Sequence, residues 1–370
     1  MPSTPNQDRD EVLRLLRTVA ADRPALFQRA DALRRARLGD AVPLRGIVEF
    51  SNICANNCLY CGIRAANTRV RRYRLSPDEI LAIARRMADW QQMTIVLQSG
   101  EAPSADGDRT LGELIRRIKK ETPLAVTLSV GNRPRDVYAR WRDCGMDRYL
   151  LRFETSDARL FAQLHPDGTL VERLDCLRAL RALGVQTGSG FMLGVPGETL
   201  AVLADNILLC RELDLDMIGI GPFIPHPDTP LAAAPNAYAA DPELFFVALA
   251  TLRLFNSDAH IPATTAFDAV VSGGRDLALQ RGANVFMPNS TPGEYRKDYL
   301  LYPNKPCVDE DAGQCAQCVV LRLSALGRTV GQGPGHSIKR PAGPRPERWP
   351  GVTAVSEDIL GFDLFPEVER

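Results

Sequence analysis

The stretch LRGIVEFSNICANNCLYC, residues 44–61, decides how the rest of the chain is interpreted. Its apolar first part, residues 44–50, predicts a strand, and the polar residues that follow predict a loop. The loop carries Cys54, Cys58 and Cys61 in the spacing C-x3-C-x2-C. Three thiolates this close together can bind one face of a [4Fe–4S] cluster. A cluster with only three cysteine ligands keeps one iron open to a further ligand.

A zinc site is the alternative for three clustered cysteines. Structural zinc usually has four ligands arranged in two close pairs. No fourth cysteine or histidine lies near this loop in sequence, and the histidines of the chain are His165, His226, His260 and His336. The spacing therefore favours an iron–sulfur cluster.

The pattern of a short apolar run, a loop and a longer amphipathic stretch repeats along the chain. Eight runs are predicted as strands: residues 44–50, 94–97, 124–130, 148–153, 185–193, 217–223, 261–267 and 283–287. Helical patterns lie between most of them, which predicts an α/β protein with a parallel sheet. Eight such units fit a complete (βα)8 TIM-type barrel, and an open doubly wound sheet is the competing architecture.

Polar residues and glycines gather at the predicted carboxyl ends of the strands, where active sites of both architectures lie. They include Ser99, Gly100 and Glu101 after the second strand. Arg152 and Glu154 are two residues apart at the end of the fourth strand, so both are expected to face the barrel interior. Charge is costly there unless it is used, and a structural ion pair between the two is the alternative to a binding role.

The flanking segments predict four regions. Residues 1–43 are expected to form helices that cap the barrel of residues 44–300. Residues 301–330 form a segment with a second group of cysteines, Cys307, Cys315 and Cys318. Residues 331–370 are rich in Gly and Pro and are expected to be a flexible or surface-wrapped tail.

Composition excludes some classes of function. The 370 residues include 45 Lys plus Arg and 45 Asp plus Glu, so no net basic field attracts nucleic acid. No apolar run approaches the ~18 residues of a membrane span, and the polar amino terminus is unlike a signal peptide. We therefore expect a cytoplasmic protein whose nine cysteines are not structural disulfides. Three isolated cysteines are expected to be small buried apolar residues: Cys144, Cys176 and Cys210.

The three-cysteine loop after the first strand resembles that of the radical S-adenosylmethionine (SAM) superfamily. The resemblance implies that the open iron binds the methionine moiety of SAM and that an electron from the cluster releases a 5′-deoxyadenosyl radical. It implies further that Tyr60 packs near the adenine, and that Ser99, Gly100 and Glu101 hold the methionine ammonium. By the same resemblance, the stretch of residues 188–198 backs the adenine, and the remaining SAM contacts are Arg152, Glu154, Arg173 and Met217.

A narrower resemblance rests on four stretches and on the second cysteine group. The stretches are SNICANNCLYCGIR (51–64), RYRLS (72–76), GIGPFIPHPDTPL (219–231) and ANVFMPN (283–289). With the spacing C-x7-C-x2-C of the second cysteines, they resemble the HydE family of [FeFe]-hydrogenase maturases. The second group suits another iron–sulfur cluster, with zinc as the alternative, and only three thiolates are evident.

The resemblance to the HydE family implies a role in assembly of the diiron subcluster of the hydrogenase. The substrate would be a small organometallic or amino-acid-derived molecule, namely an iron–cysteine complex with carbonyl and cyanide ligands. Partners would be an electron donor such as ferredoxin or flavodoxin and the sister maturases HydG and HydF. We place the substrate contacts at Thr127, Thr264 and Thr265, inside the expected barrel. Two alternatives are a methylornithine-synthase-like mutase and a non-enzymatic iron–sulfur scaffold.

Overall fold

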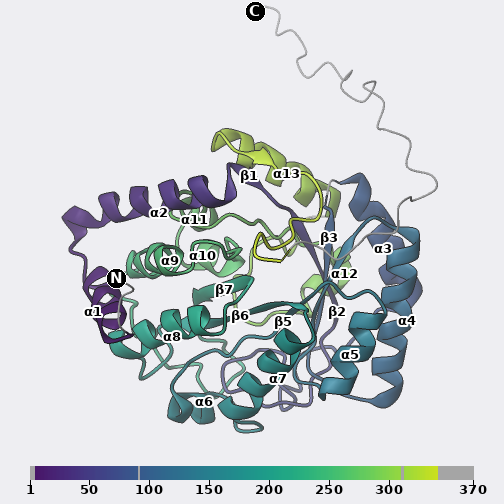
Figure 1. Cartoon of the computed structure of the whole chain (residues 1–370). Helices are drawn as coiled ribbons and strands as arrows, with labels where there is room; N and C mark the ends of the chain where they lie inside the picture. The colour runs from purple at the N-terminus through teal and green to yellow at the C-terminus, as the bar shows by residue number, and fades with distance from the viewer. Residues whose placement is uncertain (1–4, 91, 310–311, 341–370) are drawn as a thin grey trace, which may run out of the picture.

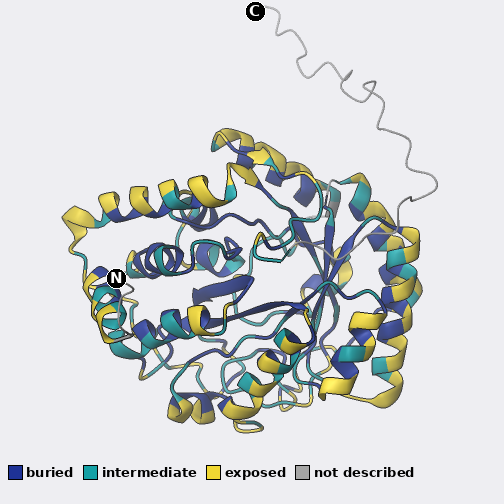
Figure 2. Ribbon diagram, in the orientation of Figure 1, coloured by how far each residue is buried: buried dark blue, intermediate teal, exposed yellow. Residues whose placement is uncertain are grey.

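A parallel sheet forms the centre of the molecule, with helices around its outside (Figure 1). The structure is a computed structural model, and it describes residues 5–90, 92–309 and 312–340. Six strands follow one another in chain order, each paired in parallel with the next. They are β2 Arg45–Ser51, β3 Thr94–Ser99, β4 Ala125–Ser129, β5 Arg148–Leu150, β6 Gln186–Leu193 and β7 Met217–Pro222. The strands are largely buried (Figure 2), as expected of a parallel sheet covered by helices.

Most of the helices expose their outer sides and bury the sides that face the sheet (Figure 2), whereas all of residues 245–253 are buried. The predicted helix start at Ser76 is confirmed, because Ser76 and Glu79 form a capping box. The helices of the sheet region are α3 Pro77–Asp89, α4 Ala105–Glu121, α5 Arg135–Asp143, α6 Ala158–Leu164, α7 Leu170–Ala182, α8 Leu200–Glu212, α9 Leu244–Phe255, α10 Thr265–Val270, α11 Gly274–Gln280 and α12 Gly293–Arg296.

Isolated bridges connect the two edges of the sheet. Met217 in β7 bridges to His260, and Pro262 bridges to Val285. Phe286 then bridges to Leu44, next to β2. The structure thus shows an α/β fold with six regular parallel strands and two further segments that contribute only single bridges within the described residues.

Two predicted strands differ from the observed ones. The strand expected at residues 261–267 is wrong from Thr265 onward, because α10 begins there. Pro262 has no N–H to donate to a ladder, which limits pairing in this segment. The strand expected at residues 148–153 ends at Leu150, and Glu154 has a left-handed backbone with φ of 63°. Strand alternation therefore does not place the Glu154 side chain.

The amino-terminal helices pack on the outer helices. They are α1 Pro5–Leu16, the short 3-10 helix η1 Ala20–Asp22 and α2 Arg23–Leu38. α1 contacts α8 and α9, and α2 contacts α9 and α11. Beyond the sheet, α13 Ala312–Ala325 precedes β8 Thr329–Val330, which pairs in parallel with β1 Ala41–Val42.

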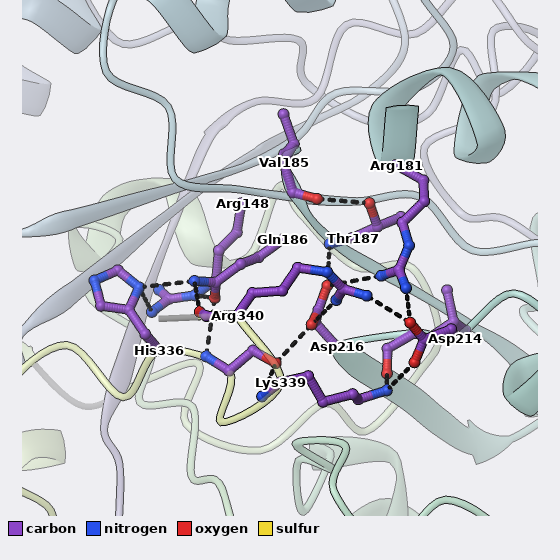
Figure 3. A network of polar contacts seen from close by, with 12 residues as sticks. Arg148, Arg181, Val185, Gln186, Thr187, Asp214, Asp216, His336, Lys339 and Arg340 are labelled. Carbon is purple, nitrogen blue, oxygen red and sulfur yellow. Dashed lines mark hydrogen bonds and ion pairs between the residues drawn. The ribbon is translucent and has the colours of Figure 1, made fainter. Parts of the chain in front are cut away.

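The segment of residues 331–340, the first part of the expected tail, packs beneath the amino ends of the strands (Figure 3). The buried Arg148 guanidinium donates to the carbonyl oxygen of Pro334 at 2.8 Å. Ser337 is also buried, and its hydroxyl donates to Asp216 at 2.6 Å. Arg340 pairs with Asp214 and Asp216. The remainder of the expected tail, residues 341–370, lies outside the described residues.

Of the three isolated cysteines, Cys144 and Cys210 are buried as predicted, and Cys176 is partly exposed. Among the helices that the structure describes, none combines the length and the apolar character that crossing a membrane would require.

Candidate active site

Asn52 organises the start of the cysteine loop, directly after β2. Its side chain is fully buried, and its amide nitrogen donates to the carbonyl oxygens of Arg71 and Asp298 at 2.8 and 2.7 Å. Its side-chain oxygen accepts from the backbone N–H of Tyr73 at 2.8 Å. One side chain thus ties the strand end to the return of the loop near residue 73.

Arg72 lies at the centre of this loop. Its guanidinium donates to the carbonyl oxygens of Asn52, Ile63, Arg64 and Asn67 at 2.7, 2.8, 2.6 and 3.0 Å. The loop backbone therefore folds around the Arg72 guanidinium. Its donors bond to backbone carbonyl oxygens, so it needs no carboxylate partner. The same charge favours the ionised form of nearby thiols.

The three thiols of Cys54, Cys58 and Cys61 lie close enough to influence one another. Burial raises the pKa of all three, to about 12 for Cys61, and the neighbouring thiols raise the pKa of Cys58 further. The charge of Arg72 opposes this rise at Cys54 and Cys61. A buried group of thiols becomes anionic only with a strongly positive partner, which a bound iron cluster provides.

Among the described residues, the three thiols do not form a site for a single metal ion. In the part of the chain that the structure describes, no three His, Cys, Asp or Glu side chains gather around one point as a single metal ion requires. The ligands of a cluster attach to different iron atoms and need not meet at one point. The donor set of three cysteines suits a [4Fe–4S] cluster with one open iron.

The loop after β3 supports the cysteine loop. The backbone N–H of Ala55 donates to the carbonyl oxygen of Glu101 at 2.7 Å. A Cβ added to Gly100 would lie 2.4 Å from the carbonyl oxygen of Ile53 and 2.8 Å from the Cβ of Cys54. The glycine therefore permits a contact that no other residue allows. The Ser99 hydroxyl donates to the carbonyl oxygen of Gly100, the residue that lies against Cys54.

Arg152, Glu154 and Arg173 converge behind the cysteines. Arg152 Nη2 and Glu154 Oε2 are 2.9 Å apart, so the two form the ion pair considered as an alternative above. The pair is poorly aligned, however, and both atoms are buried without a hydrogen-bond partner in the described structure, as are Nε of Arg152 and of Arg173. Burial raises the pKa of Glu154, and both arginines oppose that rise. A carboxylate beside two guanidiniums complements a zwitterion with an ammonium and a carboxylate.

Glycines permit close packing of β6 against β7 beside Glu154, whose backbone N–H donates to the carbonyl oxygen of Gly190 at 3.0 Å. A Cβ on Gly190 would lie 1.9 Å from the carbonyl oxygen of Gly219 on β7. Met217 packs beneath Gly188, where an added Cβ would be 2.7 Å from the methionine Cε. Met217 is thus buried at the predicted place on the sheet, with contacts that a core methionine also makes.

The three predicted substrate threonines differ in their hydrogen bonding. The hydroxyl of Thr127, on β4, is buried without a partner among the described residues. Thr264 donates to the carbonyl oxygen of Ile220 at 2.8 Å, and Thr265 shares a 2.5 Å hydrogen bond with the hydroxyl of Tyr302. Thr127 is therefore the member of the set whose hydroxyl is left for a ligand.

Two cysteines of the second group lie side by side. A hydrogen bond with Cys307 is the largest of the effects that raise the pKa of Cys315, which is buried at the start of α13. Cys318 is exposed one turn further along the helix. The Arg275 guanidinium lies 3.7 Å from the sulfur of Cys307.

His165 is a contact of the cysteine loop that the sequence analysis missed. Its Nδ1 lies 3.2 Å from the sulfur of Cys58, and its Nε2 lies 3.3 Å from the hydroxyl of Tyr60. Burial, with the charges of Arg173 and Arg152, lowers the pKa of His165 to about 3. No local pattern identifies this residue, because it is 107 positions from Cys58.

Comparison with known proteins gives consistent matches. The model of the radical SAM superfamily matches residues 48–210. The "[FeFe] hydrogenase maturase subunit HydE" of Thermotoga maritima is 48% identical over 83% of this chain and 87% of its own length. A biotin synthase of Anaeromyxobacter sp. (strain K) is 30% identical over 74% of this chain and 77% of its own. The crystal structure of methylornithine synthase, at 23% identity, shares the fold with a TM-score of 0.76, covering 88% of this chain and 94% of that one.

Proposed function

Because the chain belongs to the HydE family of radical SAM hydrogenase maturases, we propose that it acts in the assembly of the diiron subcluster of [FeFe]-hydrogenase. Identity of 48% over most of both chains carries this proposal. The structure of methylornithine synthase, at 23% identity, shares only the fold, so the mutase alternative is less favoured.

The cysteine loop would hold the cluster that the family requires. When bound and reduced, a [4Fe–4S] cluster supplies the electron that cleaves SAM to a 5′-deoxyadenosyl radical. Cys54, Cys58 and Cys61 would be its ligands, and Arg72 would balance part of its negative charge. Arg152, Glu154 and Arg173 have buried polar atoms without hydrogen-bond partners in the described structure. These atoms support a catalytic site rather than a non-enzymatic iron–sulfur scaffold.

The charged residues behind the loop would orient SAM. Glu154 would accept from its ammonium or ribose hydroxyls, and Arg152 and Arg173 would bind its carboxylate. On binding, Arg152 would exchange a misaligned ion pair for aligned hydrogen bonds, and Nε of Arg173 would gain a partner. Glu101, whose carbonyl anchors the cysteine loop, would complete the ammonium site, and Tyr60 and Met217 would border the adenosine.

We also propose that the barrel is complete. The segments of residues 260–262 and 285–289 would act as the seventh and eighth strands, supported by their bridges to β7, to one another and to the β2 edge. A closed interior would keep water from a reactive radical. The buried hydroxyl of Thr127 would face the substrate, a compact iron–cysteine complex with carbonyl and cyanide ligands.

The remaining assignments follow the family. The sister maturases HydG and HydF would supply the precursor and accept the product, and a ferredoxin or flavodoxin would supply electrons. A cytoplasmic location would keep the thiols reduced before iron binds.

A maturation assay tests the proposed function. Hydrogenase apoprotein would be matured anaerobically with HydG, HydF and this chain, and hydrogen evolution would be measured. We expect evolution to require the chain and to be lost with Cys58→Ala, which removes a cluster ligand. The HydE of Thermotoga maritima serves as the positive control. If that protein supports evolution and the cluster-loaded native chain does not, the proposal is wrong.

We further propose that Cys307, Cys315 and Cys318 hold a second iron–sulfur cluster. The adjacency of Cys307 and Cys315 supports it. Replacing all three by Ser should lower the amount of iron bound per chain. The about four iron atoms of the first cluster should remain. Replacing Cys54, Cys58 and Cys61 instead should remove the iron of the first cluster. Equal iron in the native chain and in the C-terminal triple variant would show that no second cluster forms.

A further inference from the structure

His165 follows α6 and points its imidazole at the cysteine loop. The side chain is buried, with a relative exposure of 6%. Its ring stacks on Phe161, with centroids 4.5 Å apart and planes 18° apart, and meets the ring of Tyr60 edge-on. Each ring nitrogen has one polar neighbour, the Cys58 sulfur at Nδ1 and the Tyr60 hydroxyl at Nε2.

The backbone around His165 holds the same loop. The backbone N–H of Leu59 donates to the carbonyl oxygen of Leu164 at 2.9 Å. The backbone N–H of Asn57 donates to the carboxylate of Asp167. Three consecutive residues, 57 to 59, thus contact residues 164–167, so hydrogen bonds on both sides of the pair hold the imidazole near the sulfur.

The protons in this arrangement follow from what each atom can donate. A cysteine that binds iron is a thiolate, and its sulfur can only accept a hydrogen bond. A hydrogen bond from His165 to this sulfur therefore requires a proton on Nδ1. In the tautomer that carries its single proton on Nδ1, Nε2 accepts. The Tyr60 hydroxyl is the donor within reach of Nε2. The result is a directed chain from Tyr60 through His165 to Cys58, with every polar atom satisfied.

We propose that His165 is a positioning residue that donates a hydrogen bond to the Cys58 thiolate and makes the cluster easier to reduce. The inference rests on the proposed function, because it requires the cluster. Reduction adds negative charge to the cluster and its sulfurs. An N–H directed at a sulfur stabilises that charge and raises the reduction potential, whereas an apolar neighbour does not.

Two isosteric substitutions test the position of the donor. The side-chain N–H of His165→Asn lies near the place of Nδ1, and that of His165→Gln lies near the place of Nε2. The probe is the reduction potential of the reconstituted protein without SAM, from a titration followed by electron paramagnetic resonance. We expect the Asn variant to keep the native potential and the Gln variant to shift to a more negative one.

Two aromatic substitutions complete the test. His165→Phe retains stacking on Phe161 without any N–H, and we expect the largest negative shift. Tyr60→Phe removes the donor to Nε2 and weakens the preference for the Nδ1–H tautomer, so a smaller shift of the same sign is expected.

The outcomes separate this inference from the proposed function. If all variants keep the native potential, or lose iron with no change in the potential of the cluster that remains, His165 is only structural and the inference is wrong. The inference also fails if the Asn and Gln variants shift equally. A native chain that binds no cluster would overturn the proposed function itself.

Discussion

Gly100 carries the strictest steric requirement beside the cysteines. Any Cβ there would overlap the backbone of Ile53 and the Cβ of Cys54, neither of which can move without displacing a ligand. We expect Gly100→Ala to lower the iron bound after reconstitution well below the native amount, at a cost to stability of about 1–3 kcal/mol. Iron analysis and thermal melting measure the two effects.

Gly293 provides a matched control for this substitution. A Cβ added there would meet no heavy atom within 4 Å, so Gly293→Ala should leave iron content and melting temperature near native values. Native iron content in Gly100→Ala would mean that the loop after β3 can withdraw from the cysteines. The steric account of the site would then be incorrect.

Individual residues also show how far the sequence could predict the site. The proximity of the three cysteines could be predicted because their spacing is local, and the proximity of Gly100 to Cys54 could be predicted because strand ends share an edge. His165 was not, because its contact with Cys58 depends on how α6 packs. Thr264 and Thr265 were placed on a strand, although Thr265 begins α10.

At the level of elements, the segment of residues 331–340 makes contacts that its composition does not reveal. Its Gly and Pro content predicts a poor core, yet its backbone carbonyls satisfy buried cations. Arg45 donates to Gly335 and Arg148 to Pro334, at the amino ends of β2 and β5. Composition alone misses this, because the partners are carbonyl groups that every residue carries.

A pair of truncations tests this role. A chain that ends at residue 330 leaves Arg148 and Asp216 without these partners, whereas one that ends at residue 340 keeps them. Removing the partner of a buried charge lowers the free energy of unfolding by on the order of 3–5 kcal/mol. We expect the melting temperature of the shorter chain to lie below that of the longer one by on the order of 5 °C or more. Equal melting temperatures would show that the segment contributes nothing to stability.

For the whole molecule, the alternation of strands and helices correctly predicted the parallel sheet and its order. The regular strands stop at β7, where the sequence suggested two more. Pro262 and the start of α10 explain part of the difference, because both interrupt strand pairing. The cysteine loop, the loop after β3 and the charged residues Arg152 and Glu154 nevertheless lie at the predicted edge of the sheet.

The central claim is that this chain cleaves SAM with a cluster bound by Cys54, Cys58 and Cys61. The most direct test is to reconstitute the protein anaerobically, reduce it, add SAM and quantify 5′-deoxyadenosine by chromatography, with Cys58→Ala as the control. The account predicts 5′-deoxyadenosine from the native chain and none from the variant. Its absence from a native chain with an intact, reduced cluster, with the iron–cysteine precursor also present, would contradict the account and favour the iron–sulfur scaffold.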